Sequence, residues 1–405
     1  MKMLLTISWR NIWRNPGRSG VLFAAIVAGL WAGVLVVAWA NGLVEQRMNY
    51  LIQTELSHAQ IHHPEFRTER ESSMYIADAS PILSTLEEDS RVQAFAPRTI
   101  TDGMLQSPVT TSGISIRGID VEKEPRVTTL HENITEGDYL DTDVRNPVLI
   151  SNRIADTHNV EIGHRIVLNF QDAENELTAA SFTIVGLYQT SSSGYDERNV
   201  FVRTQDLSPL LSDQQIYHEI AVWLNDEEDV EAVVNGLNER LDQIEVQTWY
   251  ELSPELRYLS DAGGLMMTVI MVIIMMALAF GILNTMLMAI FERMRELGML
   301  LAIGMSKARV FLMIMLESII LTLTGAAAGL ILASLTIAYL SRQGIDLTMF
   351  GEGLSELGYD SIVYPIMTLN HYGNVAIIVV IAALLASLFP AMKAIKINPV
   401  EVDQE

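Results

Sequence analysis

Four uncharged apolar runs divide this chain, one before and three after a long stretch of ordinary globular composition. The runs contain no Asp, Glu, Lys or Arg and cover residues 21–40, 265–291, 318–341 and 373–392. A helix rises about 1.5 Å per residue and the hydrocarbon layer is about 30 Å thick, so about 20 apolar residues suffice to cross it. The chain is therefore predicted to be an α-helical membrane protein with a sizeable domain between its first and second spans.

The first run is longer than the apolar core of a cleavable signal peptide, and no clear small-residue cleavage site follows it. We expect it to be a retained membrane helix. The predicted segments are a cytoplasmic amphipathic helix at 1–18, transmembrane helices at 19–44, 262–291, 310–341 and 373–392, a periplasmic domain with its stalks at 45–261, a cytoplasmic coupling segment at 292–309, a periplasmic loop at 342–372 and a cytoplasmic tail at 393–405.

The negative charge of the chain belongs to the inserted domain. The whole chain has a formal net charge of −23, whereas residues 45–261 contain 39 acidic and 15 basic residues, a net of −24. Such a surface repels polyanions, which disfavours nucleic acid and anionic lipid as partners of this domain.

Basic residues near the ends of the runs predict the orientation. They are Lys2, Arg10, Arg14, Arg18, Arg293, Arg295, Lys307, Arg309, Lys393 and Lys396. Positive charge near helix ends marks the cytoplasmic side, so both termini and the loop at 292–309 are expected there and the acidic insert on the far side. The chain has no Cys, so cysteine usage does not indicate a redox compartment.

The N-terminal segment at 2–17 has the pattern of a helix in the membrane interface. Its apolar side would carry Leu5, Trp9, Ile12 and Trp13, and its polar side Arg10, Arg14 and Arg18. Tryptophan at head-group level with arginine toward water is typical of such a helix, which Pro16 and Gly17 would end. A simple topology anchor is the alternative interpretation.

The insert is predicted to be an α+β domain, with two lobes as one arrangement, connected to the membrane by stalks at 45–60 and 249–264. Its β-branched and aromatic clusters between turn residues predict strands. The expected strands are 92–100, 113–119, 147–151, 164–170, 181–188, 199–203 and 219–224, and the expected helices are 80–90, 151–159, 205–212 and 226–242.

No catalytic constellation is visible in the insert. His58, His62, His63 and Glu65 are the best metal candidates, because His58 and His62 would share one face of a helix. A strand would separate them, and structural or surface histidines are the favoured alternative. The carboxylates at 226–229 favour the acidic first turn of a helix over a calcium site. Residues 191–194 lack the GxSxG pattern of a nucleophile elbow. We expect no metal and no catalytic residue.

Small residues four apart occur in three of the spans. The pairs are Gly29 with Gly33, Ala277 with Gly281, and Gly325 with Gly329. Such pairs allow close helix approach in lipid, either within the chain or in a dimer. Glu317 is a charge inside the third predicted transmembrane helix, 310–341, and we expect it to pair with Arg293, Arg295 or Arg309 rather than to relay protons.

The segment between the second and third runs is predicted to be a short amphipathic helix beside the membrane. Glu292, Arg295, Glu296 and Met299 recur at helical steps, and Gly298 and Gly304 are expected to break the helix. Such charges suit contact with a soluble partner, and the candidate contact residues are Glu292, Arg293, Arg295, Glu296, Gly298 and Gly304.

Several segments together resemble one known family, the FtsX-like permeases of MacB-type ABC transporters. They are SWRNIWRNPGRS near the start, ISIRGIDVEKEP, ITEGDYL, VLISNRIADTHNVEIGHRIVL and FTIVGLY in the insert, the ER·RE·G····AIG·S segment after the second run, and FPAMKAIKINPVEV with Pro390, Ala394, Pro399 and Glu401 near the end. Each motif is loose, but their order spans nearly the whole chain. The lipoprotein-releasing LolC/LolE type is the most similar subfamily.

The resemblance implies a permease of the bacterial inner membrane that works as a dimer, with itself or a paralogue, and with a separate ATPase dimer that binds ATP and Mg. The sequence itself agrees that ATP is hydrolysed by a separate subunit. A P-loop needs GxxxxGK[ST], and no Gly-Lys dipeptide occurs in the chain. We therefore expect no cofactor in this chain and no ATP hydrolysis by it. Members of the family work by mechanotransmission, in which ATPase closure moves the coupling segment and the stalks. The resemblance therefore implies ATPase coupling at Glu292, Arg293, Arg295, Glu296, Gly298 and Gly304.

Three functions remain open. The first is extraction of lipoprotein or other lipid-anchored cargo, with a periplasmic acceptor as a further partner. The second is efflux of small molecules or peptides. The third is a scaffold that activates an extracytoplasmic hydrolase. For the first, we predict a dimer contact and cargo cleft on the first two membrane helices. The predicted cleft residues are Gly29, Gly33, Val36, Trp39, Val269, Ala277 and Gly281.

Overall fold

The computed structural model describes residues 6, 8–10, 14, 16–241, 243–356 and 359–395. They form two compact units. The first, here the helical unit, comprises residues 1–44, 260–346 and 362–405, and the second, here the sheet domain, comprises 45–259 and 347–361. Each unit is described by itself.

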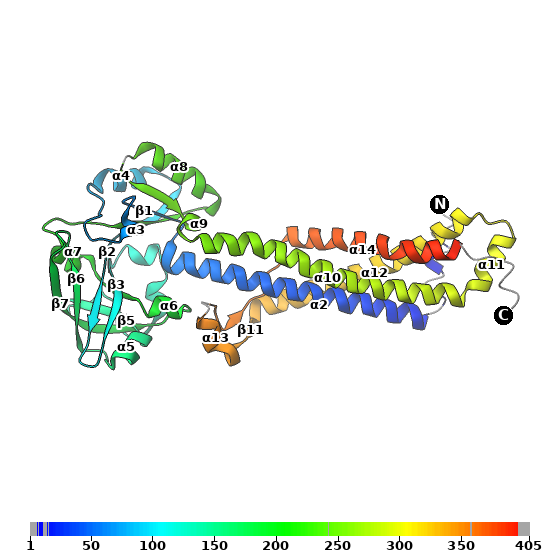
Figure 1. The fold of residues 1–405 in the computed structure, drawn as a ribbon, viewed down its shortest axis with the longest axis horizontal. Coiled ribbons are helices and arrows are strands. Elements are labelled where there is room, and N and C mark those ends of the chain that lie inside the picture. The colour runs from blue at the N-terminus through cyan, green and yellow to red at the C-terminus, as the bar shows by residue number, and fades with distance from the viewer. Residues whose placement is uncertain are drawn as a thin grey trace. The chain divides into compact units, whose positions relative to one another are not determined.

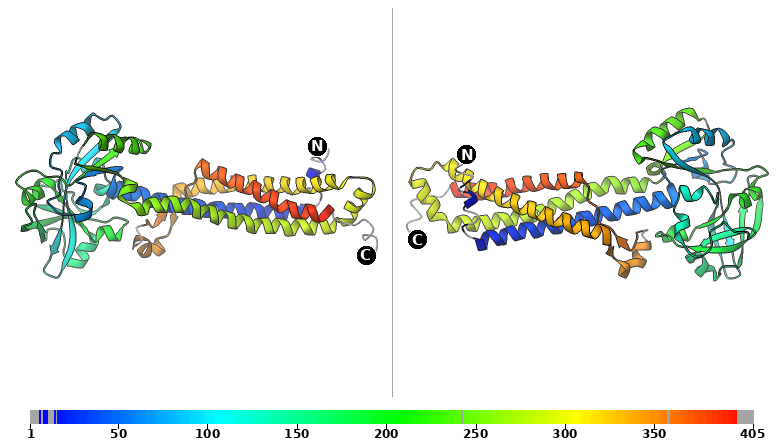
Figure 2. Two further views of the ribbon diagram at one scale, coloured as in Figure 1. Left: turned by 45° about the horizontal axis from the view of Figure 1, so that its top comes forward. Right: turned by 180° about the vertical axis from the view of Figure 1, so that it is seen from behind.

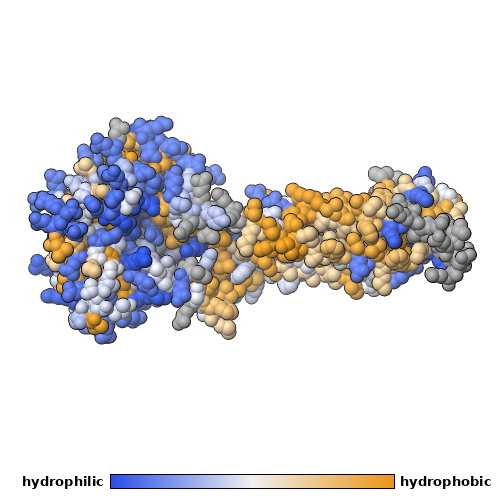
Figure 3. Space-filling view, viewed as in Figure 1, coloured by the Kyte–Doolittle hydropathy of each residue, from blue (hydrophilic) through white to orange (hydrophobic). Residues whose placement is uncertain are grey.

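Four long helices build the helical unit. They are α2 (Pro16–Leu51), α10 (Pro254–Glu292), α12 (Lys307–Gln343) and α14 (Leu369–Ile395). They run alongside one another in every view (Figures 1 and 2). Each contains a stretch long and apolar enough to cross a membrane, and the face of these helices that Figure 3 shows is predominantly hydrophobic. The predicted arrangement of one span, a large domain and three further spans is confirmed.

Helix α2 packs closely against α12 of the same chain. Gly325 and Gly329 of α12 allow close approach, because a Cβ on Gly325 would lie 3.0 Å from Ile26 and one on Gly329 would lie 3.1 Å from Leu30. Ile26 and Leu30 belong to the buried core of the bundle. The small-residue pair of the third span thus serves intrachain packing, one of the two alternatives that the sequence left open.

The segment after β12 (Ile362–Val363) is fixed to α2. The backbone N–H of Ile366 donates to the carbonyl of Ala38 at 3.0 Å. A Cβ added to Gly42 would overlap the carbonyl oxygen of Tyr364 and lie 3.2 Å from Cα of Pro365. Since backbone atoms surround the site, no side-chain rotation relieves the overlap.

Gly42→Ala is therefore expected to destabilise the helical unit by about 1–3 kcal/mol, the usual cost of overpacking. Thermal unfolding in detergent micelles measures the effect. Gly20→Ala is the matched control, because a Cβ there meets no atom within 4 Å in the described part of the chain. Equal melting of the two variants would contradict the packing of this segment on α2.

Ten strands form the sheet domain. They are β1 (Ala59–His62), β2 (Val92–Gln106), β3 (Thr111–Ile119), β4 (Ile134–Gly137), β5 (Pro147–Ser151), β6 (Arg165–Gln171), β7 (Leu177–Tyr188), β8 (Asn199–Arg203), β9 (Glu219–Leu224) and β10 (Glu245–Thr248). Their order is β10-β1-β9-β2-β3-β8-β5-β7-β4, and β6 pairs with both β2 and β7. The strands from β2 through β3, β8, β5, β7 and β6 back to β2 thus close a ring.

The long strand β2 is shared by two lobes. Its first half, Val92–Arg98, pairs with β9, and its second half, Thr99–Gln106, pairs with β3. One core lies where α4 (Ser80–Glu88) and α8 (Val230–Arg240) cover β1 and β9, and a second core lies within the ring of strands. The domain is α+β, as predicted, with two lobes.

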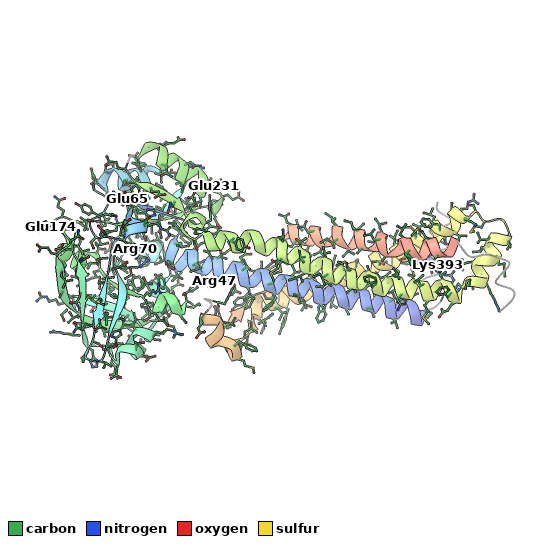
Figure 4. All side chains as sticks on the ribbon, viewed as in Figure 1. Arg47, Glu65, Arg70, Glu174, Glu231 and Lys393 are labelled. Atoms are coloured by element: carbon green, nitrogen blue, oxygen red, sulfur yellow. The ribbon has the colours of Figure 1, made fainter. Side chains whose placement is uncertain are left out.

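All seven predicted strands and all four predicted helices of the insert are present. The predicted stalk at 45–60 is too long. Helix α2 ends at Leu51, a π-helical turn covers Ile52–Leu56, and the chain then enters β1. Within 249–264, helix α9 (Trp249–Leu252) ends at Leu252, and Ser253 separates it from α10. The charged surface of the domain includes Glu65, Glu174 and Glu231, which are exposed and are labelled in Figure 4.

Candidate functional site: coupling segment, helix faces and stalk joint

The connection between α10 and α12 contains the predicted coupling residues. Helix α10 ends at Glu292, and a separate helix α11 spans Met294–Ala302. Arg293 between them has non-helical dihedral angles (φ −102°, ψ 15°). The predicted single helix is therefore wrong at this point: Glu292 and Glu296 belong to different helices and are not one turn apart on a common face.

Arg293 fastens this connection to α12. Its guanidinium donates to both carboxylate oxygens of Glu317, at 3.0 and 3.2 Å, and to Glu296 at 3.1 Å. The side chains of Arg293 and Glu317 are only 15% and 13% exposed. Glu317 thus pairs with the first of its three predicted partners. Among the predicted coupling residues, Arg293 holds α11 in place rather than facing outward.

The outer face of α11 remains accessible. Arg295 and Glu296 are exposed, whereas Leu297 packs in a core with Val310 and Met313. Glu296 also accepts a bond from Arg14, which ties the N-terminal segment to α11. Of the predicted N-terminal helix, residues 1–5, 7, 11–13 and 15, including Leu5, Ile12 and Trp13, lie outside the described residues, as do Pro399 and Glu401 of the closing pattern.

The two glycines of this segment have different roles. Gly304 has a φ of +102°, a conformation that L residues with a side chain rarely adopt, and it makes the turn into α12. Gly298 lies inside α11, and a Cβ there would meet no described atom within 4 Å. The prediction that Gly298 breaks the helix is wrong, because one glycine in a helix that packs on a neighbour does not suffice to end it.

The predicted dimer contact divides between two faces. A Cβ on Gly29 would overlap Leu278, and one on Gly33 would lie 3.1 Å from Ile274. Since both contacts are to α10 of the same chain, this pair of glycines packs α2 against α10 within one chain. The dimer prediction requires Gly29 and Gly33 to lie on a helix face that is open to a second subunit, and they do not lie on such a face.

The other small-residue pair is on an open face. Ala277 and Gly281 are exposed on α10 together with Val269 (49% exposed) and Phe280 (70%). The α10 span is the least buried of the four described spans. Val36 of α2 is 45% exposed and Trp39 is half-buried. This face of α10, which we call the α10 face, presents apolar surface to lipid or to another protein.

An apolar groove of about 390 Å³ lies between α2 and α12 rather than between the first and second spans. Its walls are Phe23, Ala24, Val27, Ala28, Trp31, Leu332 and Thr336. The indole N–H of Trp31 donates to the hydroxyl of Thr336 at 3.0 Å. The sequence did not indicate this groove, because its residues are ordinary apolar positions of two distant runs.

The end of the α2 stalk is bonded into the sheet domain. The backbone N–H of Ser191 donates to the Tyr50 hydroxyl at 2.7 Å, and that of Thr129 donates to the Gln53 carbonyl at 2.9 Å. The Ser57 hydroxyl donates to the Val127 carbonyl at 3.1 Å. The apolar side chains of the π-helical turn, Ile52 and Leu56, pack with those of the second stalk, Trp249, Leu252 and Leu256.

A buried arginine lies at the centre of this junction, which we call the stalk joint. Arg98 of β2 is 2% exposed and donates to both oxygens of Glu124, at 3.1 and 2.7 Å, and to Glu219 at 2.5 Å. It also reaches the carbonyl of Glu55 in the π-helical turn, at 3.4 Å. Arg98 and the neighbouring Arg117 hold the pKa of Glu219 below its usual range despite burial. The joint therefore connects the stalk to β2 and β9 by charge-assisted bonds.

The candidate metal histidines do not lie on a helix: His62 ends β1, and His58 and His63 directly precede and follow that strand. The His58 ring stacks on Trp223 at a centroid distance of 4.0 Å and accepts a bond from the backbone N–H of Leu224. His62 at the end of β1 is fully buried, and neither ring nitrogen has a hydrogen-bond partner in the described part of the chain. No group of three metal-ligating side chains occurs among the described residues. The carboxylates at 226–229 form a 3-10 turn, Glu227–Asp229, and its N-cap directly before α8, and Asp226 accepts from the N–H of Glu228 at 3.0 Å.

Two buried histidines predict an acid-sensitive sheet domain. Burial lowers the pKa of His62 and of His218 to about 4, from 6.5 for an exposed ring. His218 accepts from the N–H of Ile100 and donates to the carbonyl of Ser72, so only its neutral form fits. The unfolded chain binds protons that these rings do not, so their stabilising contribution is complete above pH 6.5 and is lost as the pH falls toward 4.

We expect His62→Leu to remove the part of this acid sensitivity that comes from His62. At pH 7.5 its stability should be close to that of the parent chain, since it deletes a ring without hydrogen bonds. At pH 5 the variant should be the more stable by about 2 kcal/mol, from about 1.5 pH units at about 1.4 kcal/mol each. Urea unfolding at the two pH values measures this, with the exposed His131→Leu as control. A pH dependence unchanged by His62→Leu would contradict the assignment.

Comparison with known sequences places these features in a wider group. Residues 19–240 match the MacB-like periplasmic core domain, and residues 268–399 match the FtsX-like permease C-terminal family. Over 400 residues the chain is 22% identical to the lipoprotein-releasing system transmembrane protein LolC of Neisseria meningitidis, which covers 94% of this chain and 92% of LolC. It is also 22% identical over 432 residues to the uncharacterized ABC transporter permease YvrN of Bacillus subtilis, covering 98% of both.

Other similarities are partial. The macrolide export ATP-binding/permease protein MacB of Bordetella avium is 27% identical over 140 residues, which are 34% of this chain and 19% of MacB. Among solved structures, the periplasmic region of MacB from Actinobacillus actinomycetemcomitans aligns with 51% of this chain and 95% of its own length, at 13% identity and a TM-score of 0.36.

Proposed function

Since the chain belongs to the ABC transporter permeases of the FtsX and MacB type, we propose that it extracts lipid-anchored cargo from the outer leaflet of the inner membrane. A separate ATPase supplies the energy. The observation that carries this proposal is the stalk joint: α2 is one continuous helix from Pro16 to Leu51, and the π-helical turn that follows it accepts a bond from the buried Arg98 of the sheet domain. A helix anchored in this way transmits displacement without a channel through the membrane.

The α10–α12 connection supports contact with such an ATPase. The exposed face of α11 carries both charges and apolar groups, with Arg295 and Glu296 beside Met299, which is 63% exposed. Arg293 and Glu317 fix this helix on α12, so a push on α11 moves α12 as well. We place the docking surface on this face, on the cytoplasmic side of the membrane together with both termini.

The apolar surfaces of the helical unit support a lipid-anchored cargo. Each buried methylene contributes about 0.8 kcal/mol, so a groove or face without polar groups retains an acyl chain. The groove beside Trp31 and the α10 face both have this character. In the proposed mechanism a second permease, identical or paralogous, contacts the α10 face, and stalk motion expels the anchor toward a periplasmic acceptor. The nearly full-length similarity to LolC supports this choice.

Efflux of small molecules is the second candidate function, since part of the chain is similar to the macrolide exporter MacB. Site-specific crosslinking distinguishes the two. The chain has no Cys, so single Cys residues at Val27, Val36 and Ala277 report contacts without background.

Under the proposal, Cys at Ala277 forms a disulfide between two permease subunits, and Cys at Val27 or Val36 captures acylated cargo. Cys at Val109, an exposed residue of the sheet domain, is the control. If these positions capture only soluble peptides or small molecules, efflux is the function and extraction of lipid-anchored cargo is excluded. Absence of any adduct at these positions would remove both the groove and the α10 face from the transport path.

A further inference from the structure

The connection between α12 and α14 carries the most exposed apolar side chains in the described part of the chain. Among the large apolar residues described there, Met349 is 90% exposed and Leu369, the first residue of α14, is 86% exposed. Phe350 beside Met349 is 64% exposed. We call Met349 and Phe350 the loop tip. Exposed apolar side chains that lie together mark a contact with another protein or with a membrane.

The base of this loop is a short hairpin. Strand β11 (Ile345–Asp346) pairs with β12, and the backbone N–H of Leu347 donates to the carbonyl of Ser361 at 2.7 Å. Met349 follows the end of β11 by three residues. Since a chain spans at most about 3.6 Å per residue, the Met349 backbone lies within about 11 Å of the hairpin.

Contacts with α2 fix the level of the hairpin relative to the membrane. The segment that follows β12 is bonded to Ala38 through Ile366, and Tyr364 lies against Gly42. Ala38 and Gly42 lie at the end of the uncharged run 21–40, which is where the hydrocarbon layer ends. The base of the loop is therefore at the boundary between hydrocarbon and head groups.

The returning limb of the loop is held only slightly farther along α2. The Arg47 guanidinium lies over the Tyr359 ring, 5.1 Å from its centroid. The nine residues from Ala38 to Arg47 rise about 14 Å along one continuous helix. The head-group layer is about 5–8 Å thick on each side of the membrane. These contacts thus bracket the head-group layer and leave the loop tip within reach of it.

The charges of the connection select the kind of lipid contact. Residues 344–372 contain four acidic residues and no Lys or Arg. Attraction to anionic head groups therefore does not hold the loop at the membrane. The Met and Phe side chains gain free energy when they leave water, and apolar side chains of surface-bound segments enter the boundary by about 5–10 Å. The contact is thus apolar and needs no lipid of a particular charge.

We propose that the loop tip, Met349 and Phe350, inserts into the head-group layer on the side of the sheet domain and binds phospholipid by apolar contact. It fixes the outer end of α12 at the membrane surface. The inference depends only on the four spans, so it is independent of the cargo that the permease moves.

The test uses the full Cys-free chain in phosphatidylcholine nanodiscs, with a bimane label on Met349→Cys or Phe350→Cys. A lipid with a nitroxide on its head group should quench both labels at least about threefold more strongly than a label on Val109→Cys, and iodide in the water should quench them less. Val109 is the matched control because it is 63% exposed but lies outside the loop, and Leu335→Cys, 65% exposed on α12, marks full contact with lipid.

A second variant tests the chemistry of the contact. Phe350→Asp places a charge at the tip, so it should lower lipid quenching of the label on Met349→Cys at least about threefold. The melting temperature in micelles should not change, because the side chain is exposed. Phosphatidylglycerol in the nanodisc should have no effect.

Three results would overturn the proposal. The first is iodide quenching at Met349 equal to that at Val109, which would place the tip in water. The second is protection from both quenchers, which would place a second permease subunit over the tip. The third is lipid quenching that requires phosphatidylglycerol or is unchanged by Phe350→Asp, since neither agrees with apolar insertion.

Discussion

Arg98→Met should destabilise the sheet domain by about 3–5 kcal/mol, because it leaves two buried carboxylates without their counter-charge. Glu124 and Glu219 are 2% and 6% exposed, and both depend on the Arg98 guanidinium for their bonds. The variant also loses the bond to the Glu55 carbonyl, so the stalk is released from β2. We expect loss of cargo release with the four helices still inserted in the membrane.

Unfolding in urea, followed by the fluorescence of Trp223 and Trp249, measures the loss of stability. Arg70→Met is the matched control, since Arg70 pairs with Asp102 at 2.9 Å but the two side chains are 40% and 46% exposed (Figure 4). An exposed pair contributes about 0–1 kcal/mol. If Arg98→Met were no more destabilising than Arg70→Met, the stalk joint would not be the structural centre that we assign.

Gly304→Val is expected to disconnect ATP hydrolysis from transport. The residue has a φ of +102°, and a β-branched side chain in such a backbone conformation costs about 1–3 kcal/mol. The turn between α11 and α12 should therefore change, and the docking face should move relative to the Arg293–Glu317 pair. The ATPase should still bind, but cargo release per ATP hydrolysed should fall at least about tenfold, a change of about 1.4 kcal/mol in coupling.

Gly298→Ala is the control for this prediction, because alanine fits the helix and a Cβ there has open space among the described residues. Co-purification with the ATPase and the ratio of release to hydrolysis are measured for both variants. Normal coupling in Gly304→Val, or equal loss in Gly298→Ala, would show that the geometry of this turn does not control transport.

Local sequence patterns predicted the spans and most of the insert, because the spans are long apolar stretches and the elements of the insert have clear hydrophobic periodicity or many β-branched and aromatic residues. The four runs are visible as uncharged stretches, and strands such as 181–188 combine β-branched and aromatic residues between turns. The four-residue strand β4 was missed, and so were strands β1 and β10, which have only four residues each, AQIH and EVQT, with polar side chains. Their positions are decided by pairing with each other and with β9.

Only those features of the site that depend on residues close together in the sequence could be predicted. The need for a turn at Gly304 was visible, and Glu317 was expected to find an arginine, but the choice of Arg293 depends on how α10 ends. Arg98 and Glu219 are 121 residues apart, so no spacing rule indicates their pairing. The partner of Gly29 and Gly33 was equally hidden, because small residues four apart predict a close contact but not with which helix.

ATP-driven release of a fluorescent acylated protein from proteoliposomes that contain this permease, its second permease subunit and the ATPase tests the central claim most directly. The account predicts release that requires ATP hydrolysis and stops in Arg98→Met, whereas a cargo of the same sequence without acyl chains gives no signal. Release that continues at the parent rate in Arg98→Met, or that is equal for acylated and unacylated cargo, would contradict it.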